Sequence, residues 1–347
     1  MQAVATREER TALAEHRQRA VRLSSGEILA ELVTAYATMG RLNADRSNAV
    51  LVVHGYTTGP SMLDPGSNAA EGSWSGLVGP GRAIDTNRWF VICPNMLGSS
   101  YGSTGPASID PRTGKPYGIS FPRIDVGDIV DAQRSMIDSM GIERLAAVVG
   151  PSLGAMQAFM WGTRYPGRVA RVVAAVGAPH HPALLDSVKV LEQLAGDPGW
   201  HDGRYYEHPG SMIPCLTKMR LATLERYGID AELASKFPEA AARRKEIERL
   251  AAEWANEFDP ASLYVLARAV EGFDVRGDLA RMTAPLLYVL SRTDAGFPPS
   301  LARDLAPAFD QAKLRWSYVE LDSEKGHLAS GADSQLWADS LARFMEA

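Results

Sequence analysis

The stretch Ala147-Val148-Val149-Gly150-Pro151-Ser152-Leu153-Gly154-Ala155-Met156-Gln157 decides the fold. An apolar run from Leu145 to Val149 leads into Gly-x-Ser-x-Gly, and a helix-compatible run from Ala155 to Trp161 follows directly. This order predicts a strand, a sharp turn and a helix. Gly-x-Ser-x-Gly also occurs by chance in loops, where the serine is only a turn residue. The flanking runs favour a nucleophile elbow, in which Ser152 is exposed above a sheet edge.

Further strands are predicted on both sides of this stretch. Continuous apolar runs without alternation are typical of strands buried on both faces of a parallel sheet. Such runs occupy 49–53, 89–93 and 285–290, and further strand signals lie at 169–176 and 315–321. Alternation between Glu27 and Met39 predicts strands that open the sheet. Helical spacing predicts helices at 124–140 and 334–345. A Gly, Ser and Pro-rich loop without regular structure is expected from Asn95 to Phe121, and loops of this length are usually functional.

Strand signals disappear between residues 179 and 278, where helical periodicity takes over. We therefore expect an α/β core at 26–178 and 279–347, and a helical lid at 179–278. Residues 1–25 carry many charges and are expected to be a tail or a helix. The predicted fold class is α/β: a mostly parallel sheet with helices on both faces and a helical lid insertion.

Composition excludes several function classes. Lys and Arg total 36 against 41 Asp and Glu, a net charge of −5, and both signs are scattered along the chain, so we expect neither nucleic acid nor a membrane as partner. The two cysteines have no metal or redox spacing. We expect no leader peptide, because residues 1–21 are polar and charged, and no apolar run approaches the about 18 residues that span a bilayer. A soluble, cytoplasmic protein is expected.

A serine nucleophile needs a base and an acid, which follow it in the chain order nucleophile, acid, histidine in this fold. Of seven histidines, only His327 lies beyond the 285–290 run. Asp294 follows that run directly and is the preferred acid. Asp322 and Glu324, close to His327 in sequence, are weaker candidates. The alternative interpretations are that His327 is only a solvated loop histidine and that Asp294 is only a turn residue.

The oxyanion donors are expected to be main-chain groups: the N–H of Leu153, next to the nucleophile, and the N–H of Tyr56, after the 49–53 strand. His54 is interpreted as a structural residue of that loop. We predict no metal site, because the only adjacent histidine pair, His180 and His181, points its rings to different faces. No phosphate-binding loop is present, and no cofactor is expected.

Several segments resemble the homoserine O-acetyltransferases of the α/β-hydrolase superfamily. These are YATMGRLN from Tyr36, GPGRAIDTNRWFVICPN from Gly79, GSTGPASIDPRTGKPYG from Gly102 and GPSLGAMQ from Gly150. The resemblance covers the chain from about Tyr36 to its end. It implies that Ser152, Asp294 and His327 form a triad that is acylated by an acyl-CoA co-substrate. It further implies that Arg220 binds the substrate carboxylate and that the lid contributes to a homodimer.

One departure from the family bears on the substrate. The family typically has an aspartate directly after the catalytic histidine, where it meets the homoserine amino group, and this chain has Leu328. Pro151 and Ala155 also replace glycines that the family usually has. We therefore predict an acyl-CoA-dependent O-acyltransferase with another hydroxyl acceptor. A carboxylic-ester hydrolase is the alternative, and a catalytically inactive binding protein on this fold is a third class.

Overall fold

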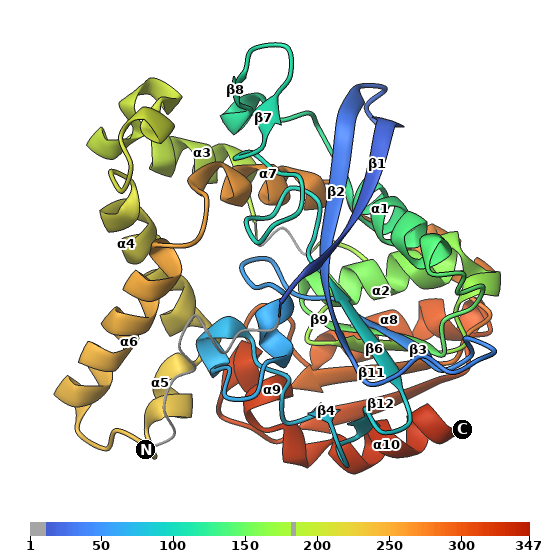
Figure 1. Cartoon of the computed structure of the whole chain (residues 1–347). Coiled ribbons are helices and arrows are strands. Elements are labelled where there is room, and N and C mark those ends of the chain that lie inside the picture. Colours follow the sequence, from blue (N-terminus) through green and yellow to red (C-terminus); the bar gives the residue numbers. More distant parts are fainter. Residues whose placement is uncertain (1–11, 182–184) are drawn as a thin grey trace.

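An eight-stranded sheet forms the centre of the molecule (Figure 1). The computed structural model describes residues 12–181 and 185–347. The strand order is β1-β2-β6-β3-β9-β10-β11-β12. β1, β2 and β6 pair antiparallel, and all other neighbours pair parallel. The strands are β1 (Ala14–Arg22), β2 (Ile28–Met39), β3 (Ala49–Val52), β6 (Phe90–Pro94), β9 (Ala147–Pro151), β10 (Val172–Ala175), β11 (Leu286–Ser291) and β12 (Trp316–Leu321). The predicted mostly parallel α/β sheet is confirmed.

The central strands are buried on both faces. In β3, Val50 and Val52 belong to the apolar cluster on one face of the sheet, and Ala49 and Leu51 belong to the cluster on the other. This alternation within an entirely apolar strand explains why the run showed no polar side in the sequence. The carboxyl ends of these strands are where ligands bind in open α/β sheets.

Helices cover both faces of the sheet. The core helices are α1 (Val126–Ser139), α2 (Leu153–Arg164), α8 (Ser300–Gln311), α9 (Ala329–Ala332) and α10 (Ala338–Glu346). Apolar residues of α1, α2 and α8 pack into one cluster, whereas those of α10 pack into the cluster on the opposite face. α1 begins with a capping box, in which Asp125 and Asp128 satisfy each other's backbone N–H groups.

Five α-helices fall within the described residues of 179–278, and Figure 1 shows α4, α5 and α6 standing apart from the sheet. They are α3 (Ser187–Ala195), α4 (Ile213–Tyr227), α5 (Ile229–Leu233), α6 (Ala240–Ala255) and α7 (Pro260–Val270). The two ends of this segment meet, because His180 and Asp274 form an isolated β-bridge and Val275 N–H donates to Pro179 O at 2.9 Å. We call residues 179–278 the lid. Its division from the core as a separate unit stays a prediction.

The expectation of a tail or helix at 1–25 is wrong for the part that the structure describes. β1 runs from Ala14 to Arg22 and pairs with β2, with Ala14 opposite Tyr36. Most of its side chains are exposed, so its sequence carries no apolar period. The strand is held at the sheet edge by backbone pairing with β2 across a short connection, and backbone hydrogen bonds do not appear in the side-chain pattern. Residues 1–11 lie outside the described residues.

Two further expectations need correction. The closing helix predicted at 334–345 is divided into a 3₁₀ turn (Ser334–Leu336) and α10. The break occurs at Trp337, whose indole is buried and donates to Ser330 O at 2.9 Å, which turns the backbone away from helical geometry. The loop expected to lack regular structure contains a small hairpin, β7 (Ile109–Asp110) and β8 (Lys115–Pro116). Another short pair, β4 (Val78–Gly79) and β5 (Ile84–Asp85), lies before β6.

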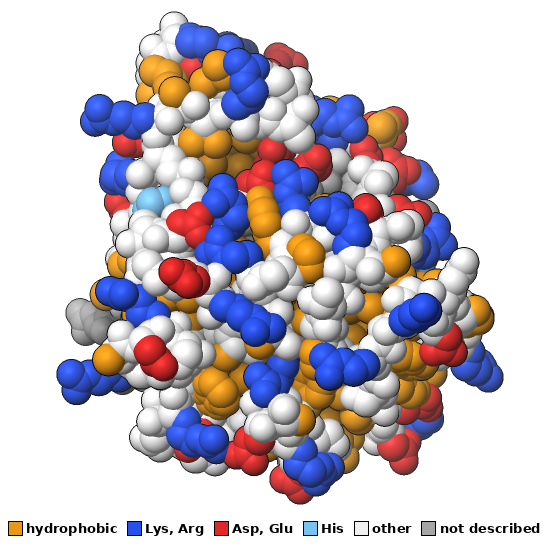
Figure 2. All heavy atoms as spheres, turned by 90° about the vertical axis from the view of Figure 1, so that its right-hand side faces the viewer, with side chains coloured by type: hydrophobic (Ala, Val, Ile, Leu, Met, Phe, Trp, Pro, Cys, Tyr) orange, Lys and Arg blue, Asp and Glu red, His pale blue; other side chains and the backbone are white. Residues whose placement is uncertain are grey.

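The surface carries both signs of charge. On the face shown in Figure 2, lysine and arginine side chains lie among acidic ones. Some form exposed ion pairs, such as Arg164 with Asp131 at 2.7 Å and Arg168 with Asp138 at 2.6 Å. Such exposed pairs contribute little to stability. Across the described ranges, none of the helices combines the length and hydropathy needed to cross a bilayer.

Candidate active site

Ser152 occupies the sharp turn between β9 and α2. Its φ of 58° and ψ of −122° lie outside the regions that L-residues favour, a strain typical of functional positions. The turn requires its two glycines. A Cβ on Gly150 would lie 2.6 Å from Val53 O, and a Cβ on Gly154 would lie 2.2 Å from the same atom. The helix therefore begins in contact with the end of β3, and the predicted strand, turn and helix are confirmed.

Three side chains from distant parts of the chain meet at this turn. His327 Nε2 lies 2.8 Å from Ser152 Oγ, and His327 Nδ1 lies 2.7 Å from Asp294 Oδ2. An ionised carboxylate only accepts hydrogen bonds, so the imidazole proton is on Nδ1 and Nε2 is free to accept from the serine hydroxyl. The structure thus brings together the three residues that the sequence singled out, in the geometry of an activated nucleophile.

Asp294 is held by its own turn after β11. Its Oδ1 accepts hydrogen bonds from the N–H groups of Gly296, at 2.8 Å, and Phe297, at 3.1 Å. Burial alone raises the pKa of this carboxyl, but the nearby His327 and these two N–H donors outweigh burial, and the net pKa is lowered. Asp294 is therefore an anion that fixes the orientation of the imidazole.

The two weaker acid candidates have another partner. Arg292 Nε lies 2.7 Å from Asp322 Oδ1, and the same guanidinium pairs with Glu324. Both carboxylates are exposed at 86% and 72%. They face solvent and Arg292, so Asp294 is the carboxylate bonded to the histidine.

Thr293 ties the acid turn to the histidine turn. Its hydroxyl donates to Ser323 O at 2.9 Å and accepts from Gly326 N–H at 3.0 Å. Since Thr293 precedes Asp294 and Gly326 precedes His327, these two bonds help to set the separation of the acid and the base. Sequence reasoning missed this residue, although its place beside the preferred acid was a usable signal.

The lid also contacts the histidine. The centre of the Tyr227 ring, at the end of α4, lies 4.5 Å from the centre of the His327 ring, and the Phe297 ring stacks on the same imidazole at 5.6 Å. Lys325 Nζ bridges Glu232 of α5, at 2.9 Å, and Asp333, at 2.6 Å. These contacts join α4 and α5 to the turn that carries His327.

The two predicted oxyanion donors lie on segments that flank Ser152. A Cβ on Gly55 would lie 3.7 Å from Ser152 Cβ, so the loop after β3 passes the nucleophile closely. Tyr56 and Leu153 line one pocket together with Ser152. Within the part of the chain that the structure describes, neither backbone N–H has an acceptor. The Tyr56 hydroxyl donates to Leu263 O at 2.5 Å, which fixes the loop to α7.

His54 has a structural role, as expected from the sequence. Met96 N–H donates to His54 Nε2 at 3.1 Å, so Nδ1 carries the proton and donates to Gly55 O at 2.9 Å. Burial lowers its pKa to about 4, and the ring is therefore neutral. Both ring nitrogens serve to hold the loop that leads to Tyr56.

Arg220 is a buried cation beside Ser152. It extends from α4 into a pocket that Ser152, His327 and Leu328 also line. Its Nη1 donates to Thr57 Oγ1 at 2.7 Å, and its Nη2 donates to Ala70 O. Its Nε is buried without a partner, and no carboxylate lies within ion-pair distance among the described residues. Burial lowers the pKa of the guanidinium, an effect that Tyr101, Tyr227 and Glu71 oppose.

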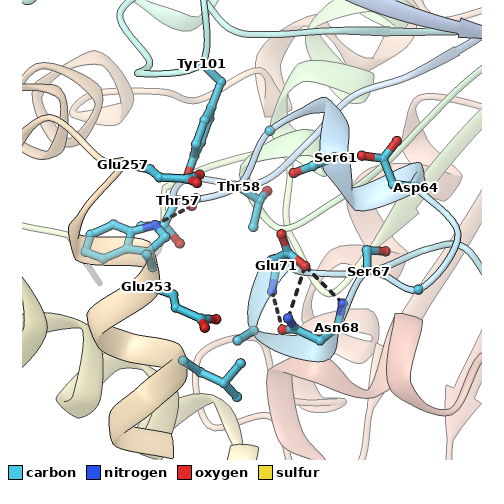
Figure 3. A pocket seen from close by; sticks show the side chains of 15 residues that line it. Thr57, Thr58, Ser61, Asp64, Ser67, Asn68, Glu71, Tyr101, Glu253 and Glu257 are labelled. Carbon is cyan, nitrogen blue, oxygen red and sulfur yellow. Dashed lines mark hydrogen bonds between the residues drawn. The ribbon is translucent and has the colours of Figure 1, made fainter. Parts of the chain in front are cut away.

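A second, polar pocket adjoins this one (Figure 3). Thr57, Thr58 and Ala70 line both. Trp254 Nε1 donates to Thr57 O at 2.9 Å, and the Arg220 guanidinium lies 4.9 Å from the Trp254 ring centre. The other walls are acidic, with Asp64, Glu71, Glu253 and Glu257. Thr57 and Trp254 thus fix Arg220 at the boundary between the two pockets.

Leu328 contributes an apolar wall to the pocket of Arg220. Only 9% of it is exposed, and it packs in a cluster with Leu224 of α4, Ile229 of α5 and Leu250 of α6. The position at which the family carries a carboxylate is therefore apolar and is covered by the lid. An ammonium group placed here would have no anionic partner on this residue.

No metal site was identified: residues 12–181 and 185–347 contain no group of three or more His, Cys, Asp or Glu side chains that could hold an ion. Both cysteines are buried and unpaired.

The chain is similar to known proteins over nearly its whole length. The family model described as the alpha/beta hydrolase fold matches residues 48–331. A homoserine O-succinyltransferase of Methylibium petroleiphilum is 39% identical, over 88% of this chain and 86% of that protein. A homoserine O-acetyltransferase of Geobacter sulfurreducens is 35% identical, over 94% of both chains.

Solved structures of the same fold also match the chain over nearly its whole length. The homoserine O-acetyltransferase from Bacillus anthracis has a TM-score of 0.81 and 27% identity, covering 97% of this chain and 98% of that one. Esterase E22 has a TM-score of 0.84 over 96% of this chain and 99% of its own, and at 24% identity this similarity concerns the fold alone.

Proposed function

The chain belongs to the α/β-hydrolase family, in its homoserine O-acyltransferase-like branch, and from this premise we propose an acyl-CoA-dependent O-acyltransferase that works through an acyl-Ser152 intermediate. The observation that carries the proposal is the continuous hydrogen-bond path from Ser152 Oγ through His327 to Asp294. In this proposal the acyl donor is a co-substrate, and no cofactor takes part.

In the first half-reaction, His327 Nε2 takes the proton of the Ser152 hydroxyl while Oγ attacks the thioester carbonyl carbon. The oxyanion that forms is stabilised by the N–H groups of Tyr56 and Leu153. The C–S bond breaks, and the thiolate leaves with the proton from His327. Asp294 stabilises the imidazolium throughout.

In the second half-reaction, His327 takes the proton of an acceptor hydroxyl, whose oxygen attacks the acyl carbon. The same N–H groups hold the second oxyanion. The bond to Oγ then breaks, the ester product leaves, and His327 returns the proton to Ser152. In a hydrolase the step is the same, except that water attacks the acyl carbon in place of the alcohol.

Arg220 and Leu328 support an acceptor unlike homoserine. A buried guanidinium whose Nε has no hydrogen-bond partner among the described residues suits the carboxylate of a substrate, to which it can donate charge-assisted hydrogen bonds. Leu328 cannot accept a hydrogen bond from a substrate ammonium group. Losing one charge-assisted hydrogen bond costs about 1.5–3 kcal/mol, or about 10- to 150-fold in affinity. We propose a hydroxy acid without an α-ammonium group as the acceptor.

A carboxylic-ester hydrolase is the second candidate, and Leu328 is the observation that favours it. If the apolar wall leaves no acceptor well bound, water reaches the acyl-enzyme instead. The same triad would then release the acid.

The test is a paired assay of the purified protein. Release of CoA from acetyl-CoA and succinyl-CoA is followed with and without hydroxy acids and homoserine, beside hydrolysis of p-nitrophenyl acetate. Acceptor-dependent CoA release with an acylated product by mass spectrometry supports the transferase. Inert thioesters together with ester hydrolysis identify the hydrolase. Ser152→Ala is the control, and its rate should fall by about 10⁶-fold. Activity retained in this variant would exclude Ser152 as the nucleophile.

A further inference from the structure

The side chain of Gln157 lies between two backbone segments that the proposed reaction needs at a fixed spacing. It is fully buried on α2. Its Nε2 donates to His54 O at 3.0 Å and lies 3.3 Å from Leu153 O. His54 belongs to the loop after β3, and Leu153 belongs to the first turn of α2. One amide group thus contacts both segments.

These segments carry the two proposed oxyanion donors. The N–H of Tyr56 is two residues beyond His54, and the other N–H is that of Leu153 itself. An oxyanion hole works only if both donors point at one oxygen position, at about 2.7–3.1 Å. A side chain that joins the two segments therefore controls a distance on which catalysis depends. This argument rests on the proposed function.

A buried hydrogen-bond chain fixes which way the Gln157 amide faces. The Trp161 indole can only donate, and it donates to Gln133 Oε1 at 2.9 Å. The Gln133 amide nitrogen must then face Gln157, and it donates to Gln157 Oε1 at 2.6 Å. The Gln157 nitrogen is left to face His54 O, with Met96 Sδ at 3.1 Å as a further neighbour. The carbonyls of His54 and Leu153 only accept hydrogen bonds, so they favour the same orientation of the Gln157 amide from the other side.

The loop and the helix turn are also in direct contact here. A Cβ on Gly154 would lie 3.2 Å from His54 O, so the first turn of α2 lies against the same carbonyl that Gln157 binds. Without the amide, that buried carbonyl would lose its donor and would be driven to move toward another one. Any such movement displaces the N–H of Tyr56 relative to that of Leu153.

We infer that Gln157 is a positioning residue that sets the separation between the oxyanion donors of Tyr56 and Leu153. It touches no reacting atom. Its loss should therefore weaken binding of the tetrahedral transition state and leave binding of the ground-state substrate nearly unchanged.

The test compares Gln157→Met with Gln133→Met in the full chain. Both substitutions replace a buried amide by an apolar chain of similar shape, and both break the same hydrogen-bond chain, but within the described ranges the Gln133 amide bonds Gln157 and Trp161 and makes no hydrogen bond to the oxyanion segments. Two readouts are taken: the kinetics of p-nitrophenyl acetate cleavage, and inhibition by butylboronic acid, whose serine adduct resembles the tetrahedral intermediate.

For Gln157→Met, kcat should fall by about 10- to 100-fold, the size expected of a displacement near 1 Å, with KM nearly unchanged. The inhibition constant of the boronic acid should rise by a similar factor. Gln133→Met should alter both values by less than about threefold. Equal losses in the two variants, or a KM effect without a change in boronate inhibition, would overturn the inference.

Gln157→Glu serves as a second variant if the methionine variant does not fold. It keeps the shape and the acceptor for Gln133, and at a pH high enough to ionise the buried carboxyl it replaces the donor with a second acceptor oxygen, so the same loss of boronate binding is expected there. Wild-type kinetics on Gln157→Glu would overturn the inference. If the wild-type protein is not acylated by the ester at all, the proposed function falls and this inference falls with it. If the wild type is acylated and the Gln157 variants show wild-type kinetics and boronate inhibition, the inference is overturned but the proposed function stands.

Discussion

The two sides of the pocket around Ser152 are built in different ways. On the core side, Ser152, Asp294 and His327 follow strands β9, β11 and β12. Their positions are set by the backbone of the turns at the edge of the sheet. On the lid side, Arg220 and Tyr227 reach the pocket as side chains of α4. We propose that this difference separates two tasks, in which the core side supplies the chemistry of acyl transfer and the lid side selects the substrate.

The two sides are nevertheless connected. Lys325 bonds Glu232 of the lid, and a Cβ on Gly228 would lie 2.7 Å from Lys325 O. The comparison therefore predicts that substitutions in the acid and histidine turns reduce kcat for every substrate, whereas a substitution at Leu328, a core residue that packs against the lid, changes which acceptor is used. Three substitutions test this, beginning with the largest effect.

Asp294→Asn should reduce kcat by about 10⁴-fold for all acyl donors, because the amide would stabilise the wrong imidazole tautomer.

The same substitution should also change the pH dependence of stability. The lowered pKa means that the ionised carboxylate stabilises the fold above its unfolded value of 3.8, and that this contribution is lost as the pH falls through the folded pKa. The free energies of unfolding of wild type and variant should converge below about pH 4, as measured by urea denaturation.

Asp322→Asn is the matched control for that substitution, since Asp322 is exposed and bonds only Arg292 among the residues described. Its kcat should stay within about twofold of wild type. A similar loss in both variants would mean that the acid has been assigned incorrectly.

Leu328→Asp should change the acceptor rather than the chemistry. A carboxylate in this pocket supplies the partner that an ammonium group lacks, so homoserine-dependent CoA release should rise by about 10- to 150-fold in kcat/KM. Burying the charge among Leu224 and Leu250 should lower thermal stability. Leu328→Asn has the same shape without the charge and should show no such gain. A gain with both variants would point to pocket size instead of charge.

Thr293→Val should give the smallest effect, a loss of about tenfold in kcat. The substitution keeps the shape of the side chain and removes two hydrogen bonds, each of about 1 kcal/mol, between the acid turn and the histidine turn. Thr293→Ser keeps the hydroxyl and should retain most of the activity. A change in acceptor preference with an unaltered kcat would place Thr293 with the lid side and break the comparison.

Much of the core side could be predicted from the sequence. The Gly-x-Ser-x-Gly turn, the strand that precedes Asp294 and the lone late histidine all follow the chain locally, and the structure places these residues within hydrogen-bond distance. Edge strand β1 could not be predicted, because its polar, exposed sequence is stabilised by pairing with β2. The break before α10 depends in the same way on where the Trp337 indole is buried.

The sequence by itself determined the α/β-hydrolase fold, the order of nucleophile, acid and base, and the glycines of the elbow, because these depend on backbone conformation and on apolar runs within a few residues. Only the tertiary structure decided that Asp322 and Glu324 face Arg292, that Arg220 is buried against Thr57, and that Gln157 spans the loop and the helix. Such contacts join residues far apart in the chain, and their distances are set by how the helices and the sheet pack together.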